Sequence, residues 1–513
     1  DGYADTCDAL CSYGDTQKKL DILKDPHCGA FAVIRLCGYF VLYFALCACL
    51  RFTPRVGAVW TLALVLERAL SGYAVATFPM AKNTGLAHTF ATAADKRRVQ
   101  IVLLAVSVCI GAGMALLGGG LLALAALFLI LAVLLGYDAM RESLPDTMYV
   151  DENSESPFQP LTKHPLLTIS EDTKEAEKTE FGETVVECSA AGIPLKKIRV
   201  IQEERPKVAV CGAPVGIYME TDGVMVIRTA EIRSSDGTVS RPSENILREG
   251  DYITKVNGQS IRSKQELIDA VKVSNGSPVC LSLLRDGETI EVQVTPQKSQ
   301  DGTCRLGAWV RDNMQGIGTL TFVEPDGTFA ALGHGISDVD TGKMLQLNGG
   351  ELYLTQILSV IPGKAGVPGE LQGVIHYEEK NRIGSVAENT IYGIHGVLDR
   401  EKSSALPLTV TEIAYRQEIE TGPATVRMCV DNTVEEYEAE ITEIDLRSEN
   451  TNKNFVLEIT DQRLLQKTGG IVQGNSGSPV IQNGRLIGAI THVFVNHPEK
   501  GYGVFAENML ARN

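Results

Sequence analysis

The sequence lacks several features that would indicate common functions. No two of its twelve cysteines form a CxxC pair, so neither a zinc site nor a dithiol redox motif is expected, and most are expected to be small buried apolar side chains. Basic residues are in deficit, because 47 Lys and Arg face 63 Asp and Glu and leave a net charge of −16. This charge argues against nucleic acid as a partner. Histidine is also scarce, with eight in the chain, so each can be weighed as a catalytic base.

The length and the uneven composition predict a multidomain protein. A chain of 513 residues is too long for one ordinary domain, and three or four units are expected. Residues 31–136 are strongly apolar, whereas residues 140–513 are mixed and acidic. This change in composition indicates that a membrane-embedded part precedes a water-soluble part.

Three long apolar runs predict an N-terminal α-helical transmembrane segment. Residues 31–50 hold one charge, residues 57–80 are interrupted by Glu67 and Arg68, and residues 101–136 hold none. A membrane-spanning helix needs about 20 residues, so the last run has room for two helices. The GGG at residues 118–120 is a natural break between them. The basic residues of the loops do not decide the orientation.

Four carboxylates precede these runs. Asp1, Asp5 and Asp8 recur at the spacing of one helix face, and Asp25 follows in KDPHCG. Carboxylates beside a membrane suit Mg²⁺ and a phosphate-bearing substrate. The alternative is a solvated helix face.

The same stretch, DGYADTCDAL with the later KDPHCGAF, resembles the cobalamin synthase family (adenosylcobinamide-GDP ribazoletransferase) and its DGxADTxDA…KDxxxGAF pattern. SGYAVATFPMAKNTGLAHTF, residues 71–90, is similar to a later part of that family. The resemblance covers about residues 1–115 and implies that the four aspartates hold Mg²⁺. The family's preceding helices and its GGxTGD segment have no counterpart, so residues 1–117 are expected to be a truncated version of it.

A PDZ domain (α+β) is predicted over residues 196–298, after a linker with entry strands at 138–195. ILREGDYITKVNGQSI, SKQELIDAVKVS and CLSLLRDGETIEVQVTP resemble its strand–Asn-Gly–strand unit, its helix capped by Ser263, and its hairpin around Asp-Gly. Such domains bind a peptide by strand addition and hold its terminal carboxylate with backbone amides. The expected carboxylate-binding loop and first groove strand contain Pro214, Val215, Gly216 and Ile217. The alternative is a purely structural β-domain.

Residues 299–513 are predicted to be all-β, with many short alternating runs between Gly, Pro and Asp turns. Within them, GNSGSP at residues 474–479 offers a nucleophile. A reactive serine needs a tight turn that exposes its oxygen and free amides that stabilise an oxyanion. We expect Ser476 to be that nucleophile, with the amides of Gly474 and Ser476 as the oxyanion site. The motif resembles the GDSGGP of chymotrypsin-like peptidases, which implies a double β-barrel. A plain turn is the alternative.

His334 is the predicted base and Asp461 the first candidate for the acid. His334 ends an apolar run between two glycines and precedes the serine in the chymotrypsin-like order. His492 follows Ser476 by 16 residues on the same hairpin and is expected to pack behind it. Asp399 is the second candidate for the acid, whereas Asp338 and Asp340 are suited to bracing the loop after His334. The reference pKa of histidine predicts loss of activity below roughly pH 6.5.

Residues 190–513 closely resemble the stage IV sporulation protein B peptidases. The similar runs include LGAWVRDNMQGIGTLTFVEPDGTFAALGHGISDVDTG and ITDQRLLQKTGGIVQGNSGSPVIQNG. The family's histidine, serine and proposed aspartate correspond to His334, Ser476 and Asp461. The resemblance implies an anchor at residues 118–137 and a peptidase without cofactor, outside the cytoplasm between the forespore membranes. There it would cleave a membrane-bound sporulation regulator and itself, with the PDZ domain holding a peptide, which could be its own.

Three functions therefore follow from the sequence. The first is a membrane-anchored serine endopeptidase with a regulatory PDZ domain. The second is a membrane cobalamin synthase, and the third is a non-catalytic PDZ scaffold that only binds peptides. Two such halves in one chain indicate that sequences of two proteins are joined near residue 118.

Overall fold

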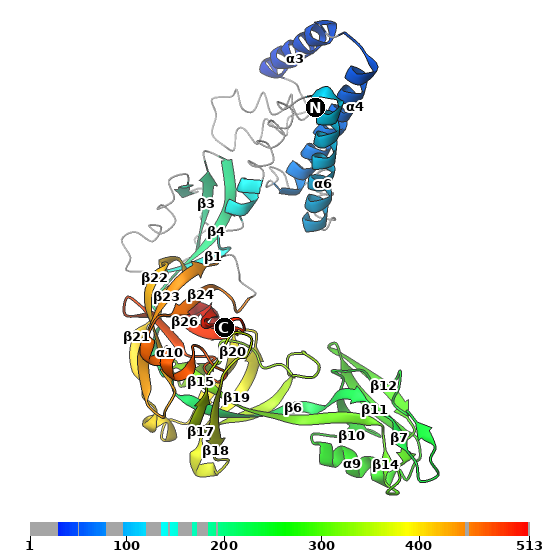
Figure 1. Cartoon of the computed structure of the whole chain (residues 1–513), viewed down its shortest axis with the longest axis vertical. Coiled ribbons are helices and arrows are strands. Elements are labelled where there is room, and N and C mark those ends of the chain that lie inside the picture. Colours follow the sequence, from blue (N-terminus) through cyan, green and yellow to red (C-terminus); the bar gives the residue numbers. More distant parts are fainter. Residues whose placement is uncertain are drawn as a thin grey trace. The chain divides into compact units, whose positions relative to one another are not determined.

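The computed structural model divides the chain into two units (Figure 1), Asp1–Glu142 with Glu187–Lys197 and Ser143–Val186 with Ile198–Asn513. The residues that it describes are 29–49, 51–77, 96–119, 135–141, 144–151, 167–171, 183–190, 193–446 and 451–510. The predicted magnesium ligands Asp1, Asp5, Asp8 and Asp25 lie outside the described residues.

The first unit contains long apolar helices, as the sequence predicts. They are α3 (Ala30–Cys49), α4 (Pro54–Thr77) and α6 (Lys96–Met114), and η1 (Ala115–Gly119) continues α6. Within the described residues, three helices are long and apolar enough to cross a membrane. Glu67 and Arg68 lie inside α4, where Arg68 Nη2 donates to Glu67 Oε1 over 2.7 Å. Most of the predicted anchor at 118–137 lies outside the described residues.

Part of the predicted linker is β-strand. The strands are β1 (Thr147–Asp151), β2 (Leu167–Glu171), β3 (Glu183–Ala190) and β4 (Ile193–Glu203), and β1 pairs in parallel with β4 from Thr147–Arg199 to Asp151–Glu203. These strands lie in the stretch for which the sequence predicts a linker with entry strands, and β4 continues beyond its predicted end at residue 195.

The PDZ domain has the predicted helix and hairpins. Its elements are the second half of β6 (Pro214–Thr229), β9 (Tyr252–Val256), β10 (Gln259–Ser260), α9 (Lys264–Val273), β11 (Val279–Arg285) and β12 (Glu288–Val294). The Ser263 side chain caps α9 by accepting from the Glu266 N–H at 3.2 Å. Asp286 and Gly287 both have positive φ, 49° and 87°, as a two-residue hairpin turn requires. Leu267 and Val271 turn into the core of this domain.

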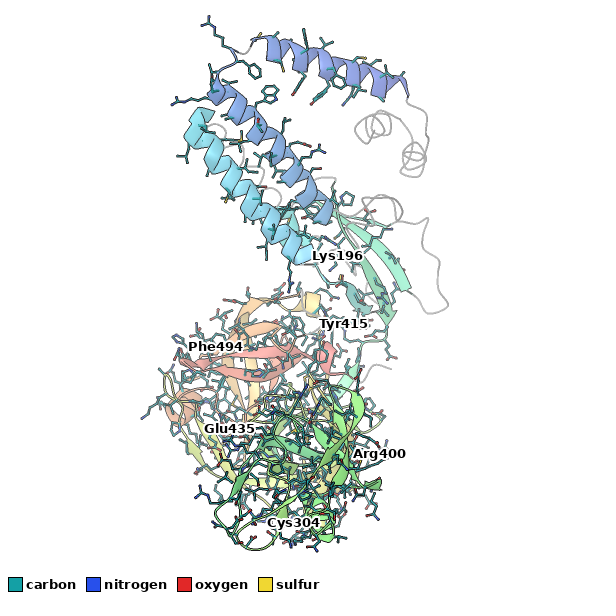
Figure 2. The ribbon with its side chains drawn as sticks, turned by 90° about the vertical axis from the view of Figure 1, so that its right-hand side faces the viewer. Lys196, Cys304, Arg400, Tyr415, Glu435 and Phe494 are labelled. Atoms are coloured by element: carbon teal, nitrogen blue, oxygen red, sulfur yellow. The ribbon has the colours of Figure 1, made fainter. Side chains whose placement is uncertain are left out.

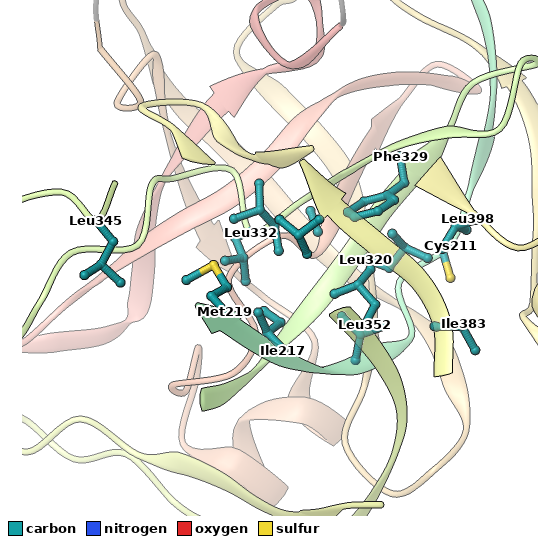
Figure 3. Close-up of a cluster of buried hydrophobic side chains, with 14 of the residues drawn as sticks. Cys211, Ile217, Met219, Leu320, Phe329, Leu332, Leu345, Leu352, Ile383 and Leu398 are labelled. Atoms are coloured by element: carbon teal, nitrogen blue, oxygen red, sulfur yellow. The ribbon is translucent and has the colours of Figure 1, made fainter. Parts of the chain in front are cut away.

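A second lobe, which adjoins the PDZ domain through β6 and β15, is built around its own apolar core. Its strands are the first half of β6, β5 (Lys207–Val210), β15 (Ala308–Val323), β16 (Thr328–Ala331), β17 (Leu347–Ile361), β18 (Glu370–Ile375), β19 (Arg382–Thr390), β20 (Gly393–Leu398) and β21 (Thr409–Glu412). Antiparallel pairing runs from β6 through β17, β19, β20, β16 and β15, and β15 pairs again with β6. Figure 3 shows Ile217 and Leu352 beside Leu320 in this core.

The two long strands β6 and β15 belong to both the PDZ domain and this lobe (Figure 1). The buried residues Val215, Ile217 and Met219 of β6 lie in the core of the lobe, whereas Val224 and Val226 of the same strand lie in the PDZ core. The PDZ domain is therefore inserted between strands of the lobe. The predicted start of the PDZ domain at residue 196 needs correction, since residues 207–221 are part of the lobe.

The C-terminal lobe is a closed barrel of six strands, so this part of the predicted double barrel is confirmed. The order is β22 (Gly422–Cys429), β23 (Val434–Ile444), β24 (Phe455–Ile459), β27 (His497–Phe505), β26 (Arg485–Phe494) and β25 (Pro479–Gln482). The barrel also carries α10 (Gln462–Thr468). Figure 2 shows Glu435 and Phe494 on the barrel and Cys304 in the PDZ domain.

The remaining elements are short. They are β7 (Ile232–Arg233), β8 (Val239–Ser240), β13 (Gln297–Lys298), β14 (Cys304–Arg305), η2 (Glu379–Asn381), η3 (Lys402–Ala405), η4 (Arg416–Glu418) and α11 (Ala506–Met509).

Candidate active site

Ser476 lies in a tight turn between α10 and β25. Gly474 and Gly477 on either side of it have φ values of 101° and 94°, which residues other than glycine rarely adopt. A Cβ on Gly477 would lie 2.2 Å from the Thr319 carbonyl oxygen. Asn475 closes the turn, because its Oδ1 accepts the N–H of Val472 at 3.0 Å. The turn therefore requires glycine at 477 for both its backbone angle and its packing.

The backbone of this turn leaves two amides available. Within the part of the chain that the structure describes, the N–H groups of Gly474 and Ser476 have no hydrogen-bond acceptor, whereas Gly477 donates to the Ile490 carbonyl at 2.7 Å. Ser476 is half-buried, and its Oγ donates to the Thr491 carbonyl at 2.9 Å. A half-buried hydroxyl with free amides nearby is the arrangement that an oxyanion site needs.

The lobe that carries His334 is fastened to the Ser476 turn through Thr319. The Thr319 N–H donates to the Ser476 carbonyl at 3.0 Å, and its Oγ1 donates to the Gly474 carbonyl at 2.8 Å. The Thr319 carbonyl in turn accepts the N–H of Leu332, two residues before His334. Strand β15 thus connects the serine turn and the histidine loop directly.

His334 leaves the end of β16 through two residues of positive φ, Leu332 at 72° and Gly333 at 68°. Its ring lies 4.9 Å from the ring of His492, centroid to centroid, and its Nδ1 is 2.9 Å from the Gly335 carbonyl oxygen. Ser476 and His334 therefore contact consecutive residues of β26, Thr491 and His492. Burial lowers the pKa of His334 below its usual 6.5, so the ring is neutral at neutral pH and able to accept a proton.

Neither predicted acid is hydrogen-bonded to His334. Asp461 caps α10 by accepting the N–H of Arg463 at 2.8 Å, and its Oδ2 pairs with Arg463 Nη2 at 2.8 Å. This hydrogen-bonded partner lowers the pKa of Asp461 to about 2. Asp399 accepts the N–H of Glu401 at 3.1 Å. The structure places the predicted nucleophile and base in contact with neighbouring residues of β26. It does not place either predicted acid beside His334, so the identity of the acid stays a prediction.

His492 is a site residue that the sequence analysis placed only behind the nucleophile. Desolvation of its ring, the neighbouring His334 and Lys453 together lower the pKa of His492 to about 4, although more than a third of the residue is exposed. A neutral His492 lies beside His334, with the two rings tilted by 36°, and does not repel the proton that His334 would gain. Its position 16 residues after Ser476 on the same hairpin was the available signal in the sequence.

The predicted carboxylate-binding loop of the PDZ domain is wrong. Pro214, Val215, Gly216 and Ile217 are buried in β6 and pair with β15 on one side. The last three of them also pair with β17 on the other side. Both edges of this stretch already have partner strands, so no peptide can add to it. The sequence pattern of residues 214–217 predicts a PDZ loop because β6 continues from them into the PDZ domain without a break.

The edge of β15 beside α9 is the accessible alternative. From Ala308 to Gly318, β15 pairs only with β6 among the described residues, and α9 packs against its first part. Asp312 of this strand accepts the N–H of Lys264 at 2.8 Å, in the first turn of α9. A strand edge beside a helix is the arrangement to which peptides add in β-augmentation.

The C-terminal lobe is a closed barrel, the PDZ domain is inserted, and a serine in a glycine turn and a histidine contact consecutive residues of β26. Together these features indicate the class of serine peptidases with a PDZ domain. Family comparison agrees with this class. Residues 302–510 match the SpoIVB peptidase S55 family, residues 215–295 match the PDZ domain, and residues 1–144 match the family described as Cobalamin-5-phosphate synthase. The chain therefore carries a SpoIVB peptidase S55 domain, a PDZ domain and a cobalamin synthase segment, as the motifs predicted.

The cobalamin synthase match extends to residue 144 and so includes the stretch 118–137, which the sequence analysis assigned to the anchor of the peptidase. The assignment of this stretch to the peptidase therefore stays a prediction.

Individual relatives match separate parts of the chain. Residues of this chain are 50% identical over 101 positions to the adenosylcobinamide-GDP ribazoletransferase of Lachnoclostridium phytofermentans, which is 20% of this chain and 38% of that protein. They are 30% identical over 131 positions to the regulator of sigma-W protease RasP of Bacillus subtilis, which is 25% of this chain and 29% of that protein. The chain thus spans about a third of the length of these curated relatives.

Among solved structures, the PDZ domain of the SdrC-like protein Lin2157 from Listeria innocua is 28% identical. The similarity covers 18% of this chain and 94% of that chain, with a TM-score of 0.15.

Proposed function

We propose that the chain is a membrane-associated serine endopeptidase in which Ser476 is the nucleophile and His334 the base. The observation that carries the proposal is the shared attachment of both residues to β26 and Thr319, which fixes the serine turn against the histidine loop. The half-buried hydroxyl and the free amides of the turn support it. The match of residues 302–510 to the S55 family supports it independently. The ring of pairings from β6 to β15 would serve as the first barrel of a double-barrel fold.

The reaction follows from these positions. Ser476 Oγ rotates from the Thr491 carbonyl towards His334 and attacks the scissile carbonyl carbon, while Nε2 of His334 takes the hydroxyl proton. The carbonyl electrons move to the oxygen, and the amides of Gly474 and Ser476 stabilise the resulting charge. The C–N bond then breaks and Nε2 returns the proton to the leaving amine. Water repeats the two steps on the acyl-enzyme and restores Ser476.

The neighbouring carbonyl of Gly335 would orient the base. With Nδ1–H donating to that oxygen at 2.9 Å, the lone pair lies on Nε2, the tautomer that a general base needs. This hydrogen bond takes the place that a carboxylate has in a Ser-His-Asp triad. The peptidase chemistry proposed here uses no cofactor.

The resemblance to sporulation peptidases supports a specific role for this activity. We infer that the substrate is a membrane-bound regulator of endospore formation, that the chain also cleaves itself, and that the peptidase domain lies outside the cytoplasm. The apolar helices of the first unit support a location at the membrane. The free edge of β15 beside α9 is the place where we expect the PDZ domain to hold a peptide, either of a substrate or of the chain itself.

A fluorophosphonate probe, which phosphonylates an activated serine, tests the proposal on the full chain in detergent. Labelling and self-cleavage should be lost in Ser476→Ala and in His334→Ala. The matched control is Ser478→Ala, in the same motif, whose buried Oγ has no hydrogen-bond partner among the described residues and whose removal should cost little. Absence of labelling in the unmodified chain would favour a scaffold that only binds peptides.

The first unit supports a second candidate function. The 50% identity over 101 positions favours ribazoletransferase chemistry at residues 1–144, for which we propose Mg²⁺ bound by Asp1, Asp5, Asp8 and Asp25. Mg²⁺-dependent consumption of adenosylcobinamide-GDP by the Ser476→Ala chain, and its loss in Asp5→Asn, would establish that activity separately from proteolysis.

A further inference from the structure

A ten-residue loop follows His334, and one side chain holds its two ends together. We call residues 336–345 the base loop. The Leu345 N–H donates to the Ile336 carbonyl at 3.0 Å. Asn389 of β19 then fixes both ends, since its Oδ1 accepts the Ile336 N–H at 2.8 Å and its Nδ2 donates to the carbonyls of Ile336 and Leu345 at 2.8 and 3.0 Å. His334 is two residues from this closure, so a displacement of the base loop displaces the predicted base.

The far end of the base loop is organised around a buried carboxylate. The side chain of Asp338 has 0% exposure. Its Oδ1 accepts the N–H groups of Asp340 and Thr341 at 3.1 and 2.8 Å, and its backbone N–H donates to the Lys343 carbonyl at 2.9 Å. A buried charge of this kind needs an oppositely charged partner.

That partner comes from the PDZ part of β15. Arg311 pairs with Met225 of β6, inside the PDZ sheet. Its Nη1 donates to Asp338 Oδ2, and its Nη2 donates to Asp340 Oδ2 at 2.8 Å. The planar guanidinium thus holds two carboxylates of the base loop at once through two separate nitrogens, in a fixed geometry that the compact ammonium of a lysine does not provide.

Two more PDZ residues contact the same segment. Lys343 Nζ lies 3.2 Å from Asp286 Oδ1, in the β11–β12 turn, and the N–H of Gln346 donates to the Tyr252 hydroxyl at 3.1 Å. The Lys343–Asp286 pair is exposed on both sides and should contribute little. Arg311 is therefore the strong connection between the PDZ sheet and the base loop.

We propose that Arg311 is a positioning residue for the reaction, which holds His334 in place from the PDZ sheet by its pairing with Asp338 and Asp340. The inference rests on the proposed function, because it takes His334 as the base. The strand that carries Arg311 is also the strand whose free edge lies beside α9. A peptide added to that edge would contact the backbone next to Arg311, so the occupancy of the PDZ domain and the position of the base are linked through one strand.

The test measures the rate and the affinity of phosphonylation of Ser476 separately. In Arg311→Ala the maximal labelling rate of the full chain should fall about 10- to 100-fold, the loss expected for a misplacement of about 1 Å. The half-saturating probe concentration should not change, because Arg311 does not touch the probe. Arg311→Lys should recover part of the rate. The matched control is Arg241→Ala, an exposed PDZ arginine that pairs with Glu231 and Glu244, and its rate should equal that of the unmodified chain.

A second variant separates positioning from stability. Arg311→Ala with Asp338→Asn removes the buried unpaired charge, so its thermal unfolding should return towards that of the unmodified chain. If Arg311 only stabilises the fold, the labelling rate returns as well, and the inference is wrong. If Arg311 positions the base, the rate stays low. An unmodified chain that is not labelled at all contradicts the proposed function, whereas unaltered labelling of Arg311→Ala contradicts this inference alone.

Discussion

Gly477 illustrates how closely the nucleophile turn depends on single residues. A Cβ at this position meets the Thr319 carbonyl at 2.2 Å and the Leu332 nitrogen at 2.5 Å, and the backbone φ is 94°. We predict that Gly477→Ala lowers the free energy of unfolding by about 2 kcal/mol or more and abolishes probe labelling. Gly484→Ala is the control, because φ is 76° there but the surrounding space is open. It should cost only about 1–2 kcal/mol and keep labelling, and equal effects in both variants would contradict the packing argument.

The pH dependence of labelling is set at the residue scale by His334. Only the neutral ring accepts the serine proton, and burial makes the charged ring less favourable, so its pKa lies below 6.5. Activity should therefore fall as the pH decreases through this lowered pKa, with a midpoint below pH 6.5. The rate of phosphonylation between pH 4 and pH 8 measures the midpoint. A midpoint at or above 6.5, the value expected from sequence alone, would contradict the effect of burial.

Substitutions of Asp461 can show whether its carboxylate takes part in catalysis or only stabilises the fold. Asn is as good a helix cap as Asp, so Asp461→Asn should keep α10 and leave the labelling rate within about tenfold of the unmodified chain. Asp461→Ala removes the cap and should lower the free energy of unfolding by about 1 kcal/mol. A drop of about 10⁴-fold in the labelling rate of Asp461→Asn, as in a triad that loses its acid, would instead show that Asp461 reaches His334 during the reaction.

At the scale of elements, the base loop should behave as one closed unit. Asn389→Ala removes three hydrogen bonds from Ile336 and Leu345, and we predict that amide exchange across residues 336–345 becomes about tenfold faster or more. Asn381→Ala is the matched control, since that exposed amide makes only a 3.4 Å hydrogen bond to the His376 carbonyl. Unchanged exchange in Asn389→Ala would show that the Arg311 pairing alone closes the loop.

At the scale of the molecule, the inserted PDZ domain makes the peptidase discontinuous in sequence. A chain of residues 299–513 lacks β5 and the first half of β6, whose buried residues include Val215, Ile217 and Met219. Each such side chain contributes about 1.5–3 kcal/mol when fully buried. We predict that residues 299–513 alone are insoluble or unlabelled, whereas residues 198–513 give a folded and labelled protein. Labelling of the shorter chain at the full rate would contradict the insertion.

Local structure was largely predictable because it depends on short-range chemistry. The Ser263 cap, the Asp286–Gly287 hairpin and the Asn483–Gly484 turn between β25 and β26 all follow from residue types at fixed spacings. Apolar length alone predicted α3 and α4, since a membrane-spanning helix requires about 20 apolar residues. Ser476 and His334 could be predicted as nucleophile and base for the same reason, because a glycine turn and a strand end are local signals.

Long-range pairing was not predictable in the same way. Whether Pro214–Ile217 faces a peptide or lies between β15 and β17 depends on strands more than ninety residues later, and the alternation of side chains is the same in both cases. The partner of Asp338 is likewise an arginine that the sequence places on another strand. Asp461 was predicted as the acid from the family resemblance, but its carboxylate pairs with Arg463 in the structure.

The sequence by itself therefore determined the classes of the parts: apolar helices, a PDZ domain and a peptidase domain with a serine turn and a histidine. Composition and turn chemistry act over a few residues, so they can be read along the chain. Only the tertiary structure decided that the PDZ domain is inserted, that residues 214–217 of β6 are unavailable to a peptide, and that Arg311 reaches the loop of His334. These features depend on which strand edges and charges meet, and the free energy of burial that selects them is a property of the whole fold.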